Sequence, residues 1–90
     1  MGKVWYSSNI MALYTKDDLI HMIREKDLRL TGHRLAVLSY LSKAKGPVTV
    51  YEIIEVLRKK HNIDQATVYR NLASLHESGL LRRLDFNHGH

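Results

Sequence analysis

The sequence predicts a mainly α-helical domain with a small β wing, arranged as a winged helix-turn-helix. Four segments each combine a capping residue with apolar residues at helical spacing. The strand-like segment "LLRRLDF" follows the last of these helices, and the turn-forming residues "NHGH" follow the strand. With a short extended link between the second and third helices, the order matches a helix-turn-helix pair followed by a hairpin.

Two parts are expected along the chain. Residues 1–14 are an N-terminal arm or leader, although "KVWYSS" within them also has strand-favouring residues. Residues 15–90 are the winged-helix domain, whose first helix is expected from Lys16 to about Lys26. Thr15 precedes this helix as its cap, and Asp18 stands where a capping box needs a side-chain acceptor.

The second helix follows "LRLTGHR" and begins after the capping residue Thr31. Its inward side is expected to hold Leu35, Val37, Leu38 and Leu41. The helix is expected to close at "KGP", because Gly46 can adopt the left-handed conformation and Pro47 cannot continue a helix. Val48 then provides the short extended link.

The third and fourth helices begin at recognisable caps. "TVYE" is a full capping box, with Thr49 as the cap and Glu52 reaching back, and Asp64 caps the fourth helix. The inward side of the third helix is expected to hold Val50, Ile53, Ile54 and Leu57. That of the fourth is expected to hold Val68, Leu72 and Leu75. Gly79 is the expected stop of the fourth helix.

The wing is expected to be incomplete, because no second hairpin strand follows "NHGH" in this sequence. Left alone, "LLRRLDF" would expose an open sheet edge. We expect a short strand around Val48 on one side of it, and either "KVWYSS" or a neighbouring chain on the other.

Composition narrows the classes of function. The net charge of +5 suits a phosphate-binding protein, although a basic surplus also serves solubility. The absence of cysteine excludes disulfides, zinc ribbons and a thiol nucleophile. Neither a membrane-spanning run nor a signal peptide is recognisable, and we expect a cytoplasmic protein without membrane contact. The chain has no Gly-rich phosphate loop and no G-x-S-x-G motif, so we expect no enzyme activity.

The outer side of the fourth helix carries the candidate binding residues. Turning its apolar residues inward leaves, near its leading end, Gln65, Ala66, Thr67, Tyr69 and Arg70. Small residues allow close approach to a DNA groove, a methyl group can meet thymine, and an arginine can form two hydrogen bonds to guanine. The alternative is a solvated surface with one incidental arginine. Against it, this side has almost none of the Glu–Lys pairs that solvated helices carry.

The stretch "IDQATVYRNLASLHESGLL" closely resembles the reading helix of the ferric uptake regulator family, in which a hydrophobic residue precedes "ATVYR-x-L". "LRLTGHRLAVLSYL" is similar to the family's "L-[KR]-x-T-x-x-R-x-x-[VI]-L", and "VTVYEIIEVL" to its "[VI]-[ST]-x-x-[ED]-[LI]-Y-x-x-L". The resemblance spans roughly Leu28 to Phe86. It implies the DNA-binding half of a metal- or peroxide-responsive repressor that binds a palindromic, A/T-rich operator as a homodimer.

The resemblance also implies roles for individual residues. Tyr69 and Arg70 would contact bases or phosphates in the major groove. Arg29 would reach a narrow A/T-rich minor groove, which concentrates negative potential, although a charge at a helix end is the simpler interpretation without the family match. Arg34 takes the place of an arginine in the family motif, and it either contacts DNA or is a salt-bridge partner within the domain.

Two arginines of the expected wing strand, Arg82 and Arg83, complete the candidate DNA-binding set. Both are plausible phosphate clamps, with the alternative that one of them points to solvent. A rival hypothesis is a winged helix that contacts another protein through its fourth helix. Such a module would bind DNA only weakly and without the steep salt dependence of phosphate contacts.

The family resemblance implies a divalent metal (Fe, Zn or Mn) in the full-length protein, bound mainly by a second domain after the wing that also forms the dimer interface. That domain is absent from this sequence, and Pro47 stands where a further family ligand is often a histidine. The six histidines lack metal-site spacing, apart from His88 and His90 in "HGH", and two ligands alone make a weak site. We expect no cofactor and no high-affinity metal site within these residues.

Overall fold

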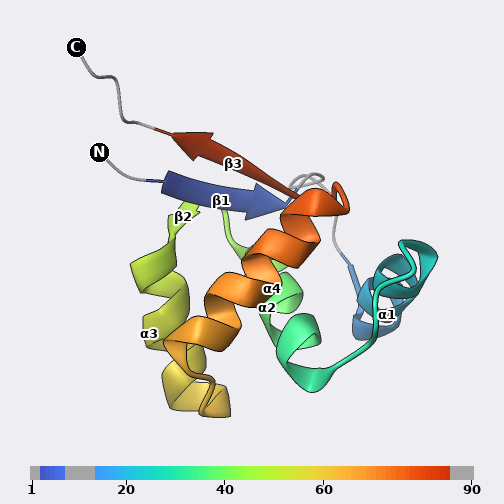
Figure 1. The fold of residues 1–90 in the computed structure, drawn as a ribbon, viewed down its shortest axis with the longest axis horizontal. Helices are drawn as coiled ribbons and strands as arrows, with labels where there is room; N and C mark the ends of the chain where they lie inside the picture. Colours follow the sequence, from blue (N-terminus) through green and yellow to red (C-terminus); the bar gives the residue numbers. More distant parts are fainter. Residues whose placement is uncertain (1–2, 8–13, 86–90) are drawn as a thin grey trace.

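The computed structural model describes residues 3–7 and 14–85 of the chain (Figure 1). Within these ranges the chain forms four α-helices and three short strands, which confirms the predicted mainly α class with a small β part. In chain order the elements are β1 (Lys3–Ser7), α1 (Lys16–Glu25), α2 (Gly32–Lys43), β2 (Val48–Thr49), α3 (Val50–His61), α4 (Gln65–Glu77) and β3 (Leu81–Asp85). The expected "NHGH" turn lies outside the described residues.

The helices begin where the sequence places their caps. Thr15 accepts from the Asp18 amide at 3.1 Å, while the Asp18 carboxylate accepts from the Thr15 amide at 2.9 Å. Thr49 and Glu52 form the same reciprocal pair at 3.2 and 3.0 Å. These bonds satisfy amides that the first helical turn leaves without a partner, which is why both helices begin at these residues.

The helix ends follow the prediction only in part. α2 ends at Lys43 through Ala44 in an extended conformation, and Gly46 does not adopt the positive φ expected for it. The left-handed conformation occurs instead at Asp27 and Asn62, with φ of 59° and 53°. Gly79, at φ 91°, follows α4 as predicted and turns the chain into β3. Glycine adopts this conformation without the steric penalty that a Cβ brings.

The N-terminal strand is the centre of the sheet, in the order β2-β1-β3 (Figure 1). β1 pairs antiparallel with β3 from Lys3 opposite Asp85 to Ser7 opposite Leu81. It also pairs with β2, where Trp5 lies opposite Val48. The expectation that the strand around Val48 would flank "LLRRLDF" is therefore wrong, because β1 lies between them. A strand of two residues has few hydrogen-bonding groups to offer β3, whereas β1 matches its five residues.

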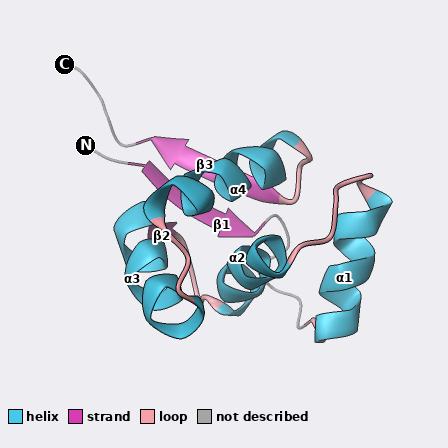
Figure 2. Ribbon diagram, turned by 60° about the horizontal axis from the view of Figure 1, so that its bottom comes forward, coloured by secondary structure: helices cyan, strands magenta, loops and turns pink. Residues whose placement is uncertain are grey.

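The core lies between one face of the sheet and the helices (Figure 2). Its members, all nearly inaccessible to solvent, are Trp5, Leu19, Ile23, Val37, Leu38, Leu41, Val50, Ile53, Leu57, Ile63, Val68, Leu72, Leu75, Leu80 and Leu81. Trp5 connects the sheet to α4, because its ring meets the His76 ring edge-on with 5.7 Å between the centroids.

The burial of helix α2 differs from the prediction at one residue of its expected inward side. Val37, Leu38 and Leu41 are buried as expected. Leu35, which was expected beside them, is only half-buried and lines a hollow on the other side of the helix. α2 therefore has apolar side chains on two faces, of which the core covers one.

We predict that Trp5→Ala lowers the free energy of unfolding by about 3–5 kcal/mol, since it removes a large buried ring at the junction of β1 and α4. Urea unfolding monitored by far-UV circular dichroism measures the change. Lys3→Ala, an exposed position on the same strand, is the matched control. Equal stability of the two variants would contradict a packed central β1.

Candidate nucleic-acid interface

The rotation of α4 about its axis is fixed by its buried side. Val68, Leu72 and Leu75 are fully buried against α2, α3 and β3. The opposite side therefore faces solvent, where Gln65, Ala66, Tyr69 and Arg70 are exposed as predicted, and Ala73 and Glu77 are exposed further along the helix. Thr67 on the flank is half-buried, and Tyr69 keeps 43% of its surface exposed. The result is a helix whose leading half presents small, amide, phenol and guanidinium groups.

The leading end of α4 is anchored by its cap. Ile63 is buried just before the helix, and the Asp64 carboxylate accepts a 2.8 Å hydrogen bond from the Thr67 amide. Hydrogen bonds from Thr67 lower the pKa of Asp64, and the charges of Arg70 and His33 lower it further. The capping carboxylate thus places a negative charge beside the first amides of the helix. This charge opposes phosphate binding at the helix start and leaves the outward side chains as the available contacts.

Asn71 is a functional candidate that the sequence analysis missed. It lies at helical spacing between Val68 and Leu75 and is 7% exposed, and its Nδ2 donates to the Thr67 carbonyl at 2.9 Å. A buried amide must be hydrogen-bonded, and this bond holds it against the backbone of its own helix. Its position on the apolar side was the signal in the sequence that could have identified it. The bond lies in the turn that carries Tyr69 and Arg70.

Arg34 has partners inside the domain. Its guanidinium donates to the Arg29 carbonyl through Nη1 and to the Ser74 hydroxyl through Nη2 at 3.2 Å, while its Nε is buried without a hydrogen-bond partner. These partners are a carbonyl and a hydroxyl, whereas the intramolecular alternative raised by the sequence was a salt bridge. Ser74 lies one turn beyond Arg70 on α4. Arg34 therefore ties the connector that carries Arg29 to the outward side of α4.

Arg29 and Arg70 are exposed arginines that form no salt bridge among the described residues. Ion pairs of the described residues form on α1, where His21 and Glu25 lie 3.1 Å apart, and on α3, where Lys59 and Glu55 lie 3.1 Å apart. Within the described ranges neither Arg29 nor Arg70 belongs to a salt bridge. A guanidinium in this situation can bind phosphate or a base edge without first breaking an ion pair.

The two strand arginines point to opposite faces of the sheet, because side chains alternate along a strand. Arg82 lies opposite Tyr6, on the face away from the core. Arg83 lies opposite Trp5, and its guanidinium sits 5.7 Å from the Trp5 ring centroid in a cation–π contact. Both are exposed. They cannot therefore grip one phosphate together from the same face.

The described residues offer little that could form a metal centre or a membrane span. No group of three or more His, Cys, Asp or Glu side chains among them could hold a metal ion. His88 and His90 lie outside the described ranges. None of the helices described is both long enough and apolar enough to cross a bilayer.

Comparison with known proteins finds one family model and several similar regulators. The model of the ferric uptake regulator family matches residues 25–90. The peroxide operon regulator of Bacillus subtilis is 34% identical over 77 residues, which cover 84% of this chain and 53% of that protein. The peroxide-responsive repressor PerR of Staphylococcus epidermidis is 32% identical over 71 residues, covering 78% of this chain and 47% of that protein. The zinc uptake regulation protein of Escherichia coli is 32% identical over 62 residues, covering 68% of this chain and 36% of that protein. The chain thus spans about half the length of the first two relatives, and less of the third.

We predict that Arg34→Ala lowers the free energy of unfolding by about 1–3 kcal/mol, because it removes two charge-assisted hydrogen bonds of α2, one to the α1–α2 connector and one to α4. Chemical denaturation measures the loss. Arg82→Ala, which removes an exposed arginine from the sheet, is expected to change stability by less than about 0.5 kcal/mol. A fully stable Arg34→Ala variant would show that the guanidinium does not hold these elements together.

The lowered pKa of Asp64 predicts a pH-dependent stabilisation of α4. A carboxyl whose pKa is lower in the folded state stabilises the fold fully above its ordinary pKa of 3.8, and the stabilisation is lost as the pH falls through the folded-state value. Asn also caps helices well, so Asp64→Asn removes mainly the charge. We expect Asp64→Asn to melt below the parent protein at neutral pH and together with it in strong acid. A difference in Tm that stays constant across this range would contradict the role of the charge.

Proposed function

Because this chain belongs to the ferric uptake regulator family, we propose that it carries the sequence-specific DNA-binding half of a metal- or peroxide-responsive transcriptional repressor. The observation that carries the proposal is the outward side of α4. Its leading half is free of exposed acids beyond the cap, it has an exposed arginine that forms no salt bridge among the described residues, and its rotation is locked by three buried residues. A reading helix needs this combination of fixed orientation and base-contacting groups.

In the proposed complex, α4 enters the major groove of double-stranded DNA. Tyr69 and Arg70 contact bases or phosphates at the centre of the interface, and Gln65 and Thr67 contact the edge nearest the helix start. Arg29 enters an A/T-rich minor groove next to this major groove. The hydrogen bond from Arg34 to the Arg29 carbonyl supports this role, because it holds the backbone that carries the Arg29 side chain.

The remaining arginines have supporting roles in this proposal. Arg34 acts mainly by holding the connector against Ser74, and it reaches the backbone of DNA only if that bond opens. Arg82 and Arg83 contact phosphates from different faces of the sheet, in keeping with their alternation along β3. Such contacts position a protein on DNA without reading its sequence.

We further propose that the whole protein is a homodimer that binds a palindromic operator in the cytoplasm and responds to Fe, Zn, Mn or peroxide. The relatives that support this are named as peroxide and zinc regulators. The described residues do not form a ligand set for the implied metal, and Pro47 stands where the family often has a histidine.

We predict that the chain binds a generic duplex with an affinity that falls steeply with salt. Each phosphate contact is expected to contribute about −0.9 to the slope of log K against log salt concentration. Fluorescence anisotropy of a labelled duplex across a salt series measures this slope. Salt-insensitive, weak contact would overturn DNA binding and favour a winged helix that contacts another protein.

Single-residue variants distinguish contacts that read bases from contacts that depend only on positive charge. On a duplex selected from a random pool, Arg70→Ala and Tyr69→Ala are each expected to lose about 1–3 kcal/mol more than on random DNA. Arg24→Ala removes the same charge from the exposed side of α1 and is the matched control, with little loss on either duplex. Equal losses on both duplexes would show that Tyr69 and Arg70 do not read sequence.

A further inference from the structure

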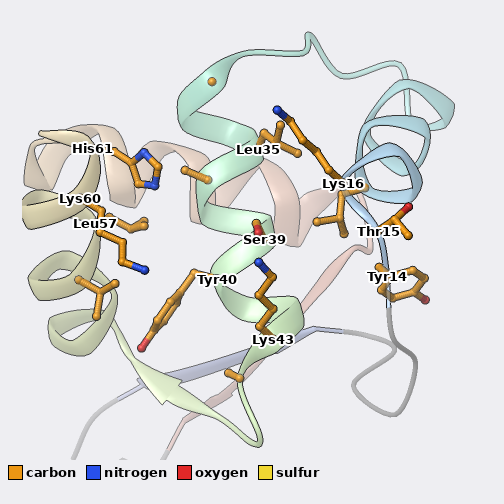
Figure 3. A pocket seen from close by; sticks show the side chains of 15 residues that line it. Tyr14, Thr15, Lys16, Leu35, Ser39, Tyr40, Lys43, Leu57, Lys60 and His61 are labelled. Atoms are coloured by element: carbon orange, nitrogen blue, oxygen red, sulfur yellow. The ribbon is translucent and has the colours of Figure 1, made fainter.

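A hollow of about 820 Å³ lies on the side of α2 that faces away from α4 (Figure 3). The outer face of α2 forms its floor, and α1 and α3 stand on either side of α2 as its walls (Figure 2). A molecule in this hollow would leave the outward side of α4 uncovered. The hollow therefore needs an explanation separate from DNA reading, and it falls in the size range of small-molecule sites.

The floor of the hollow is apolar. Side chains at helical spacing along α2, among them Leu35, Ala36 and Tyr40, line it together with Leu19 of α1 and Leu57 of α3. Leu35, Ala36 and Tyr40 are only partly buried, although each packs against the core. A helix with apolar residues on both faces is normally covered on both. Here the second face is open to solvent in the described part of the chain.

The rim of the hollow is basic. Lys16 begins α1, Lys43 ends α2, and Lys60 and His61 end α3, and all four line the hollow. Figure 3 shows Lys43 and Lys60 extending from α2 and α3 into the same space. No Asp or Glu lines the hollow, and within the described ranges the three lysines form no salt bridge. The charge of the rim therefore favours an anion.

Tyr40 adds a neutral hydrogen-bond donor between floor and rim. Burial, and then the carboxylate of Glu52, raise the pKa of Tyr40, so the phenol stays protonated. The Glu52 carboxylate is itself occupied, because it accepts from the Thr49 amide in the capping box at 3.0 Å. A phenol and lysine ammonium groups that line one hollow are suitable donors for a carboxylate.

We propose that this hollow binds an amphipathic monoanion of the fatty-acid type, with its alkyl chain along the partly exposed Leu35 and Ala36 and its carboxylate toward the rim that carries Lys43, Lys60 and Tyr40. Contact with the apolar floor supplies most of the affinity, since exposed ion pairs contribute little individually. The lysines give preference for an anion over a neutral molecule of the same shape. This inference is independent of DNA binding.

The test is a titration of the chain with sodium decanoate below its micelle concentration, followed by amide chemical shifts in NMR. Binding is expected to shift the amides of residues that line the hollow, and 1-octanol, a neutral alkyl chain, is expected to bind more weakly. In Lys43→Gln/Lys60→Gln the decanoate affinity is expected to fall about fivefold, the combined effect of two exposed ion pairs. The proposal is overturned if shifts are absent, lie elsewhere, or are matched by octanol.

Two further variants test whether decanoate binds in the hollow and depends on its two lysines. Lys26→Gln/Lys45→Gln changes the net charge equally at exposed positions that do not line the hollow, and its decanoate affinity is expected to stay unchanged. Ser39→Trp places a large ring on the floor and is expected to abolish decanoate binding while urea unfolding stays cooperative. Equal weakening in the two lysine pairs would overturn the site. A protein that binds decanoate but not DNA would refute only the repressor function.

Discussion

The packing of α4 through Val68, Leu72 and Leu75 against α2, α3 and β3 is the constraint on which the candidate interface depends. A helix turns by about 100° per residue, so burying one side determines which residues face outward along its whole length. Tyr69 and Arg70 are exposed because they point away from the side of α4 on which Val68, Leu72 and Leu75 are completely buried. The apolar core thereby orients the polar surface, and in the proposed function a side chain in this core would influence DNA reading without touching DNA.

Two side-chain hydrogen bonds further stabilise α4, which the core has already oriented. Arg34 joins the connector before α2 to Ser74 on α4, and Asn71 bonds the carbonyl of Thr67 within α4. Such partly buried bonds are expensive to leave incomplete, so the Arg34 bond holds α2 and α4 in one relative position, while the Asn71 bond acts within α4. The arginine of the family motif is explained in this way as a brace for the interface, in addition to any contact of its own with DNA.

The two basic surfaces of the molecule lie on different sides of α2. One surrounds α4 and contains the arginines Arg29 and Arg70, which form no salt bridge among the described residues. The other contains lysines around an apolar floor. Arginine forms directional, paired hydrogen bonds to bases and phosphates, whereas lysine acts as a point charge on a flexible stem. This difference in residue type matches the two proposed ligands, a duplex on one side and an amphipathic anion on the other.

The sequence by itself determined the helices, their N-terminal caps and the outward side of α4. These features depend on residues three or four positions apart, as between Thr49 and Glu52, so local spacing is sufficient to predict them. Only the tertiary structure decided that β1 lies between β2 and β3, that Arg34 reaches Ser74, and that Leu35 is half-buried at the edge of the core, where it lines a hollow. Each of these contacts joins segments far apart in the chain, and its geometry follows from how the whole domain packs. A basic residue such as Arg34 has the same local pattern whether it faces DNA or braces a helix, and its partners distinguish the two.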